Sequence, residues 1–269
     1  FASDPTPKLP TLMMIGGEFN SPTDWLRRGE AIKTADDFAA THHGNAPVLV
    51  FVDSGGAFNN DTECVDGPRG NAADHLVKDV RPYVVAHFGA SDQAVNWAVA
   101  GWSMGGTCAI DLTVMHPDLF NTFEDIAGDH GPTAGTRDQT IDRLYGGNTS
   151  TWDAFDPRTV MAQHGPYRGV AGWFEDTVKP TTSASPYQGG GHRPQSDAPL
   201  GYGGHDEFRD ADQAGAADDL CAAARAVGIG CSVHRIISFH TWQFAERAFS
   251  DALPWLAARI QTPGSIGAS

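Results

Sequence analysis

The stretch VNWAVAGWSMGGTCA, residues 95–109, joins an apolar run to a turn that contains glycine and then to a helical pattern. The run at 97–100 predicts a buried strand. The turn, GWSMG at 101–105, has the G-x-S-x-G spacing of a nucleophile elbow, in which a strand turns sharply into a helix with the serine at the apex. Small residues two before and two after the serine let neighbouring backbone pass close by. We therefore predict Ser103 as a nucleophile and the N–H of Met104 as a donor to an oxyanion.

Strand and helix patterns alternate along the rest of the chain. Short apolar runs predict further strands at residues 9–15, 48–52, 120–127, 170–174 and 231–237. Helical periodicity predicts helices at residues 23–40, 71–88 (with a bend at Pro82), 106–115, 211–227 and 241–260. This alternation is typical of a mostly parallel central sheet with helices on both faces. Together with the elbow, it predicts the α/β-hydrolase fold.

A serine hydroxyl needs a base within hydrogen-bond reach, and the α/β-hydrolase order along the chain is Ser, then Asp or Glu, then His. His240 follows the last predicted strand and precedes the final helix, so we predict it as the base. Three carboxylates are candidates for the acid that orients His240. We favour Asp206, then Glu207, both in GGHDEF, and third Asp176, which ends VAGWFED. Each carboxylate could instead be a strand-end turn residue or complement a helix N-terminus.

The loop after the first predicted strand should supply the second oxyanion-hole donor. Gly17, in IGGEF, is our candidate for that backbone N–H. The alternative is a plain turn from strand to loop. Because ligands of parallel sheets bind at the carboxyl ends of the strands, the position of every candidate just after a predicted strand supports one shared site.

We expect a single domain over residues 1–269, since there is no internal repeat and no interdomain linker. The pattern over residues 129–169 predicts an insert with two helical pieces. Residues 177–204 form a long segment rich in Gly, Pro and Ser. Loops of this length are usually functional, so both are predicted lid or pocket elements. The candidate pocket aromatics, for which core packing is an equal alternative, are Trp152, Phe155, Trp173 and Tyr202.

Composition narrows the class of partner. The 269 residues carry a formal net charge of −15, which makes nucleic acid and anionic membrane surfaces poor partners. No run of 18 apolar residues predicts a membrane span. The sequence has no Walker A motif, no G-x-G-x-x-G after a strand, and no H-E-x-x-H or C-x-x-C spacing, so we expect neither metal nor cofactor.

Four cysteines allow three sets of two disulfides, and the sequence alone does not choose among them. We favour Cys64–Cys108 and Cys221–Cys231, which would fit an exported protein. The alternative is four reduced thiols in a cytoplasmic enzyme. The chain begins at Phe1 without a Met, so we expect it to be a processed form that has lost a targeting segment.

Several motifs resemble those of the esterase D-like hydrolases, which include the antigen 85 mycolyltransferases. They are MMIGGEF, DTECVDGPRGN, GWSMGGTCAIDLTVMHPDLF and FHTWQF. The resemblance implies Ser103 as nucleophile, His240 as base, and the amides of Met104 and Gly17 as the oxyanion hole. It places the acid in the GGHDEF region rather than at Asp176. Phe239 departs from the pattern, since relatives often have Gly there.

These observations favour a serine carboxylic ester hydrolase that forms an acyl-enzyme on a small-molecule or lipid ester, such as a cell-envelope lipid or glycolipid. The first alternative is an acyltransferase of mycolyltransferase type, in which a sugar hydroxyl takes the place of water. The second is a non-catalytic cell-surface module that binds carbohydrate. We expect an extracellular or cell-envelope location, and the resemblance allows a tether ahead of Phe1.

Overall fold

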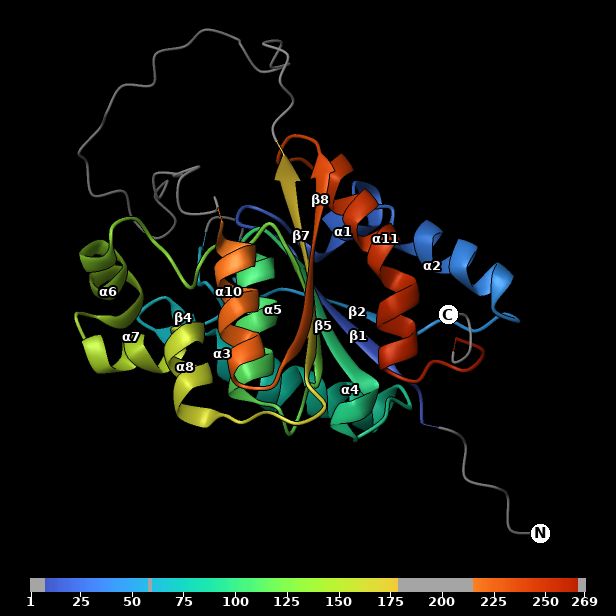
Figure 1. Cartoon of the computed structure of the whole chain (residues 1–269), viewed down its shortest axis with the longest axis horizontal. Helices are drawn as coiled ribbons and strands as arrows, with labels where there is room; N and C mark the ends of the chain where they lie inside the picture. Colours follow the sequence, from blue (N-terminus) through green and yellow to red (C-terminus); the bar gives the residue numbers. More distant parts are fainter. Residues whose placement is uncertain (1–7, 58–59, 179–214, 266–269) are drawn as a thin grey trace, which may run out of the picture.

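The computed structural model describes residues 8–57, 60–178 and 215–265 (Figure 1). Its centre is a six-stranded sheet in the order β2-β1-β5-β6-β7-β8, and every neighbouring pair is parallel. The strands are β1 (Thr11–Ile15), β2 (Val48–Val52), β5 (Trp97–Trp102), β6 (Thr122–Ile126), β7 (Ala171–Val178) and β8 (Gly230–Ile237). A short antiparallel ribbon pairs β3 (Asp66–Gly67) with β4 (Gly70–Asn71). The predicted α/β-hydrolase architecture is confirmed.

The strand order changes direction between β1 and β5. The chain runs from β1 outward to β2, then returns to pair β5 with the other edge of β1. Ligands of open parallel sheets bind outside the carboxyl ends of the strands at such a switch point. The fold therefore predicts a ligand site at the segments that follow Ile15 and Trp102. These strand ends are adjacent, because Ile15 pairs with Gly101.

Alternating strand residues face two hydrophobic clusters. Leu12 and Met14 point to one face, and Met13 and Ile15 to the other. Figure 1 shows α5 (Met104–Met115) beside α10 (Ala216–Ala226) on one face of the sheet, with α2 (Ala31–Thr41) and α11 (Trp242–Arg259) on the other. The remaining helical segments are α1 (Pro22–Arg27), α3 (Ala72–Asp74), the π-helix His75–Val80, α4 (Arg81–His87), the 3-10 helix Ala94–Asn96, α6 (Arg137–Tyr145), α7 (Thr149–Phe155) and α8 (Pro157–His164).

Two of the predicted helices are interrupted. The segment 23–40 forms α1 and α2, because Gly29 packs its backbone against Trp25 and Glu30 takes a left-handed φ of 47°. The segment 71–88 divides into α3, a π-helix and α4, and Pro82 is the second residue of α4, next to the π-helical turn. The insert 129–169 carries three helices instead of two.

Both favoured disulfides are confirmed. Cys64–Cys108 connects the loop before β3 to α5, and Cys221–Cys231 connects α10 to β8. The first spans 44 residues of sequence and the second 10, so chain entropy predicts that the first stabilises the fold more, about 4 against about 3 kcal/mol. Among the described residues no helix is long and apolar enough to cross a membrane.

Several acidic side chains lie inside the sheet, and Glu124 is the most deeply buried of them. Glu124, in the middle of β6, is fully buried, and neither carboxyl oxygen has a hydrogen-bond partner among the described residues. Burial raises the pKa of Glu124 well above its usual range, and Glu175, Asp125 and Asp251 add to this effect. The protein therefore holds Glu124 as a neutral acid.

Glu124→Gln is expected to stabilise the protein at neutral and alkaline pH. The unfolded chain ionises Glu124 near the ordinary pKa of 4.5, whereas folding must return a proton to it, so the free energy of unfolding falls as pH rises above that value. Glutamine removes the penalty, and the free energy of unfolding should rise by at least about 1 kcal/mol at pH 8 and by little at pH 5. Thermal unfolding against pH measures this, with exposed Asp36→Asn as control. An equal effect at both pH values would contradict the assignment.

Candidate active site

Ser103 lies between the end of β5 and the start of α5 in a strained backbone conformation. Its φ is 59° and its ψ is −123°, a region that residues other than glycine seldom occupy. The Ser103 N–H donates to the carbonyl of Ile126 at 2.9 Å, and the Ser103 carbonyl accepts from the N–H of Gly106 at 2.8 Å. Such strain persists where surrounding structure over-determines it, typically at functional sites.

The glycines of the motif allow two very close backbone contacts. A Cβ added to Gly101 would lie 1.9 Å from the carbonyl oxygen of Gly105. A Cβ added to Gly105 would lie 2.4 Å from the carbonyl oxygen of Ile15, at the end of β1. The steric reason for the G-x-S-x-G spacing is therefore present in the structure, and the second contact fixes the elbow against the loop that follows β1.

That loop brings Gly17 against the serine. A Cβ on Gly17 would lie 3.1 Å from Cβ of Ser103 and 3.2 Å from the carbonyl oxygen of Trp102. Met104 is the first residue of α5, so its N–H is not needed by the helix. Gly17 and Met104 also line the same cleft. The two predicted oxyanion donors and the predicted nucleophile thus come together, although their roles stay predictions.

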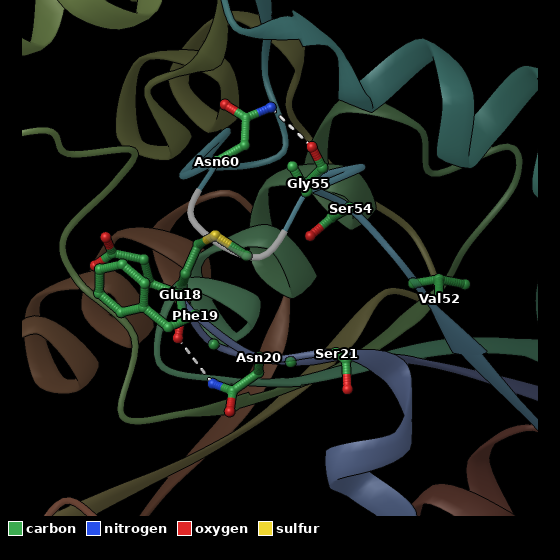
Figure 2. A pocket seen from close by; sticks show the side chains of 12 residues that line it. Glu18, Phe19, Asn20, Ser21, Val52, Ser54, Gly55 and Asn60 are labelled. Carbon is green, nitrogen blue, oxygen red and sulfur yellow. Dashed lines mark hydrogen bonds between the residues drawn. The ribbon is translucent and has the colours of Figure 1, made fainter. Parts of the chain in front are cut away.

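We call this the Gly17 cleft; it encloses about 320 Å³ between atoms, part of it open to solvent. Figure 2 shows the loop after β1 facing the loop after β2 across it. Its walls are mostly polar side chains and glycine backbone. The lining residues are Gly16, Gly17, Glu18, Phe19, Asn20, Ser21, Val52, Ser54, Gly55, Ala57, Asn60 and Met104.

Two asparagines that the sequence reasoning did not single out organise this cleft. The Asn20 amide donates to the carbonyl of Glu18 at 2.9 Å, and its oxygen accepts from Nε1 of Trp242 at 3.2 Å. The Asn60 amide donates to the carbonyl of Gly55 at 2.7 Å (Figure 2) and to that of Arg69 at 2.9 Å. Asparagine just after a strand and in a glycine-rich loop was the available signal, because its amide mimics a backbone turn.

His240 lies in the loop between β8 and α11, half-buried. Its ring stacks on Trp102, the residue before Ser103, with ring centroids 5.1 Å apart. Trp102 in turn packs on Trp242 at 4.5 Å, and Trp242 donates to Asn20 as described above. Direct contacts through Trp102 and Trp242 therefore connect the loop with His240, the elbow and the loop after β1.

The predicted acids have different positions. Asp206 and Glu207 lie outside the described residues, as does Tyr202. Asp176 lies within β7, in register with Arg235 of β8, and its Oδ1 accepts from the N–H of Thr177 at 2.6 Å. Burial raises the pKa of Asp176. All three remain candidates for the acid.

A second pocket, the insert pocket, lies in the segment after β6 and encloses about 820 Å³, much of it open to solvent. Trp152 lines it, and the guanidinium of Arg137 lies 4.5 Å from the centre of the Trp152 ring. Phe155 instead is buried beside Tyr145, and Trp173 stacks on His234 at 3.6 Å in the sheet. The lining residues are Asp129, His130, Gly131, Pro132, Thr133, Gly135, Arg137, Thr140, Trp152, Asp156 and Arg158.

Buried acids surround the elbow helix. Asp125 accepts from the N–H of Gly128 at 2.8 Å, and burial raises its pKa to about 7. Burial also raises the pKa of Asp111 on α5, and of Glu63 in the loop before β3, well above the usual range of a carboxyl group. Among the described residues, no three His, Cys, Asp or Glu side chains are arranged to hold a metal ion.

Comparison with known proteins identifies the class. Residues 2–233 match the family described as "Putative esterase". A protein of Corynebacterium glutamicum, described as uncharacterized, is 34% identical over 177 residues, 64% of this chain; the match spans 41% of that relative. The chain belongs to this esterase family.

Solved structures share the fold at low identity. A ferulic acid esterase superposes with a TM-score of 0.64 at 14% identity, covering 94% of this chain and 86% of that one. An S-formylglutathione hydrolase from Agrobacterium tumefaciens gives 0.62 at 14%, covering 94% and 85%. MPT51 of Mycobacterium tuberculosis gives 0.61 at 17%, covering 95% and 91%. The expected resemblance to esterase D-like and antigen 85 proteins is confirmed.

Gly17→Ala is expected to lower turnover of p-nitrophenyl acetate about 10-fold to 100-fold, because the new methyl would displace the loop from Ser103 by a few tenths of an ångström. Gly230→Ala is the control, since a Cβ there meets nothing within 4 Å. Both variants should unfold close to the wild-type temperature. Wild-type turnover in Gly17→Ala would show that the loop does not need its close approach to the serine.

Proposed function

We propose that this esterase works through an acyl-enzyme formed on Ser103. The observation that carries the proposal is the strained Ser103 at the end of β5, in contact with the Gly17 loop at the switch point of the sheet. A serine at positive φ between Gly101 and Gly105 matches the nucleophile elbow, and Ser103 retains 8% exposure at the surface. We further propose that residues 1–269 form one domain, with 129–169 and 177–204 as lid and pocket elements.

In this mechanism His240 takes the proton from Oγ of Ser103 as Oγ attacks the ester carbonyl carbon. The negative charge that develops on the carbonyl oxygen is held by the N–H groups of Gly17 and Met104. The tetrahedral intermediate then collapses, and the alcohol leaves with the proton carried by His240. Water, deprotonated by His240, attacks the acyl-enzyme and releases the acid and free Ser103.

An acidic side chain would hold the His240 tautomer and stabilise its protonated form. Asp206 remains the first candidate, followed by Glu207 and Asp176. The position of Asp176 inside β7, with its Oδ1 occupied by a backbone N–H, makes it the weakest of the three.

The lining of the Gly17 cleft favours an ester substrate whose alcohol part is polar. Amide and hydroxyl groups of Asn20, Ser21, Ser54 and Asn60 line it, and such groups suit a hydroxyl-rich partner better than an alkyl chain. A glycolipid or another cell-envelope ester fits this lining. The two disulfides are compatible with the extracellular or cell-envelope location that we propose.

The same polar lining favours acyl transfer as a second candidate. If a sugar hydroxyl occupied the cleft during deacylation, it would take the place of water and accept the acyl group. The strained serine argues against a non-catalytic carbohydrate-binding module, because binding alone does not require that backbone conformation.

Ser103→Ala is expected to lower hydrolysis of p-nitrophenyl esters by at least about 1000-fold and to abolish covalent labelling by an organophosphonate. Esters of graded chain length, assayed with and without trehalose, would report acyl preference and transfer. Ser150→Ala, an exposed serine on α7, is the control and should behave as wild type. Absence of both turnover and labelling in the wild-type protein would favour the binding module.

A further inference from the structure

The DTEC segment, residues 61–64 of the DTECVDGPRGN motif, has no role in the mechanism above, yet its structure is unusual. All four residues are at most 5% exposed, and two of them carry carboxyl groups. Glu63 and Cys64 have φ values of 48° and 52°, so two consecutive residues other than glycine are left-handed. Buried carboxyl groups and left-handed backbone are both unfavourable, and strain of this kind is typical of functional segments.

Several bonds hold the segment in this conformation. Cys64 forms the disulfide with Cys108, which lies on α5 five residues after Ser103. The hydroxyl of Thr62 donates to the carbonyl of Ser54 at 2.9 Å. Arg69 pairs with Asp61 at 3.3 Å. The disulfide therefore makes the nucleophile helix and the DTEC segment one unit.

Within this unit, Glu63 faces acidic groups from three parts of the chain. It shares a side-chain hydrogen bond with Asp61, and the charges of Asp61, Asp129 and Glu18 all act on it. Tyr145 of α6 is also within electrostatic reach of Glu63. Arg69 is the cation that pairs with Asp61. Burial raises the pKa of Glu63, and the surrounding carboxylates raise it further, so a neutral Glu63 can donate its proton to Asp61.

Two of the acidic neighbours of Glu63 line two different pockets. Glu18 follows Gly17 in the loop after β1 and lines the Gly17 cleft. Asp129 follows β6 and lines the insert pocket, and its N–H donates to Oγ1 of Thr107, also on α5, at 2.9 Å. Glu63 is thus within electrostatic reach of the segments that form the two pockets.

We propose that Glu63, fixed by the Cys64–Cys108 disulfide, is a positioning residue that aligns the Gly17 loop and the Asp129 turn on either side of Ser103. The inference rests on the proposed function and deepens it. Glu63 does not touch the reacting atoms; it acts through the backbone that carries them. While Glu63 is neutral, its hydrogen bond offsets the repulsion among Glu18, Asp61 and Asp129. When alkaline pH ionises it, a further negative charge joins these groups and the alignment is lost.

The test compares kcat and KM for p-nitrophenyl acetate between about pH 6 and pH 9.5 in four proteins. Glu63→Ala should lower kcat about 10-fold to 100-fold with little change in KM, because positioning errors act on the chemical step. Glu63→Gln keeps a neutral donor, so its kcat should stay within about 3-fold of wild type at pH 7 and should lose the alkaline decline. Glu124→Gln, another buried acid on β6, should keep the wild-type kcat and pH profile.

The disulfides provide a second matched comparison. Cys64→Ala with Cys108→Ala should lower kcat at least about 10-fold at a temperature where the variant is folded. Cys221→Ala with Cys231→Ala should lower the unfolding temperature and leave kcat unchanged, since that pair joins α10 to β8. Thermal unfolding of every variant separates loss of fold from loss of alignment.

Wild-type kcat in folded Glu63→Ala, or an alkaline decline that persists in Glu63→Gln, would overturn the positioning role. Ser103→Ala belongs in the same series. If the wild-type protein turns over substrate and Ser103→Ala does not, a failure at Glu63 concerns the positioning role alone. If the wild-type protein has no turnover, the proposed function and this inference fall together.

Discussion

The backbone contact between Gly105 and the carbonyl of Ile15 is the constraint on which the site depends. It requires that helix α5 begin almost against the end of β1, and no side chain fits between them. Ser103 then has no room for an ordinary strand-to-helix transition and takes its positive φ. The same contact brings the loop after β1 beside the serine. One steric condition therefore produces both the strained Ser103 and the backbone amides beside it.

This acidic protein buries several of its carboxyl groups, which is unusual. With a formal net charge of −15, the chain could leave its carboxyl groups in water, yet Asp61, Glu63, Asp111, Glu124 and Asp125 are all buried. Burial of an ionised carboxylate is costly, so raised pKa values and neutral acids are the expected response. The stability lost in this way is offset in part by the two disulfides, which restrict the unfolded chain.

Much of the fold and part of the site could be predicted from sequence. The glycine spacing around Ser103 reflects local sterics, and the buried strands are continuous apolar runs, so both are visible in the chain. The break between α1 and α2 was not predictable, because it depends on Gly29 meeting Trp242 from the far end of the sequence. The burial of Asp61 and Glu63 was not predictable either. An acidic loop is typical of solvent-exposed surface, and here the Cys64–Cys108 disulfide fixes the loop against α5. The acid partner of His240 stays undecided because its best candidates, Asp206 and Glu207, fall in a segment with no periodic pattern.

The order of the segments that meet at Ser103 has a consequence for folding kinetics. The loop with Gly17 follows β1, Ser103 follows β5 and His240 follows β8, and Trp242 contacts Asn20 across 222 residues of sequence. Contacts of such separation form slowly, because the entropy of closing long loops is lost before the contacts compensate for it. While only the first strands have paired, the loop with His240 is not yet beside Ser103. While β1 is unpaired, the loop with Gly17 is not beside it either. With the residue roles that we propose, esterase activity would therefore return only at the final step of sheet assembly. No activity would be measured at the earlier steps.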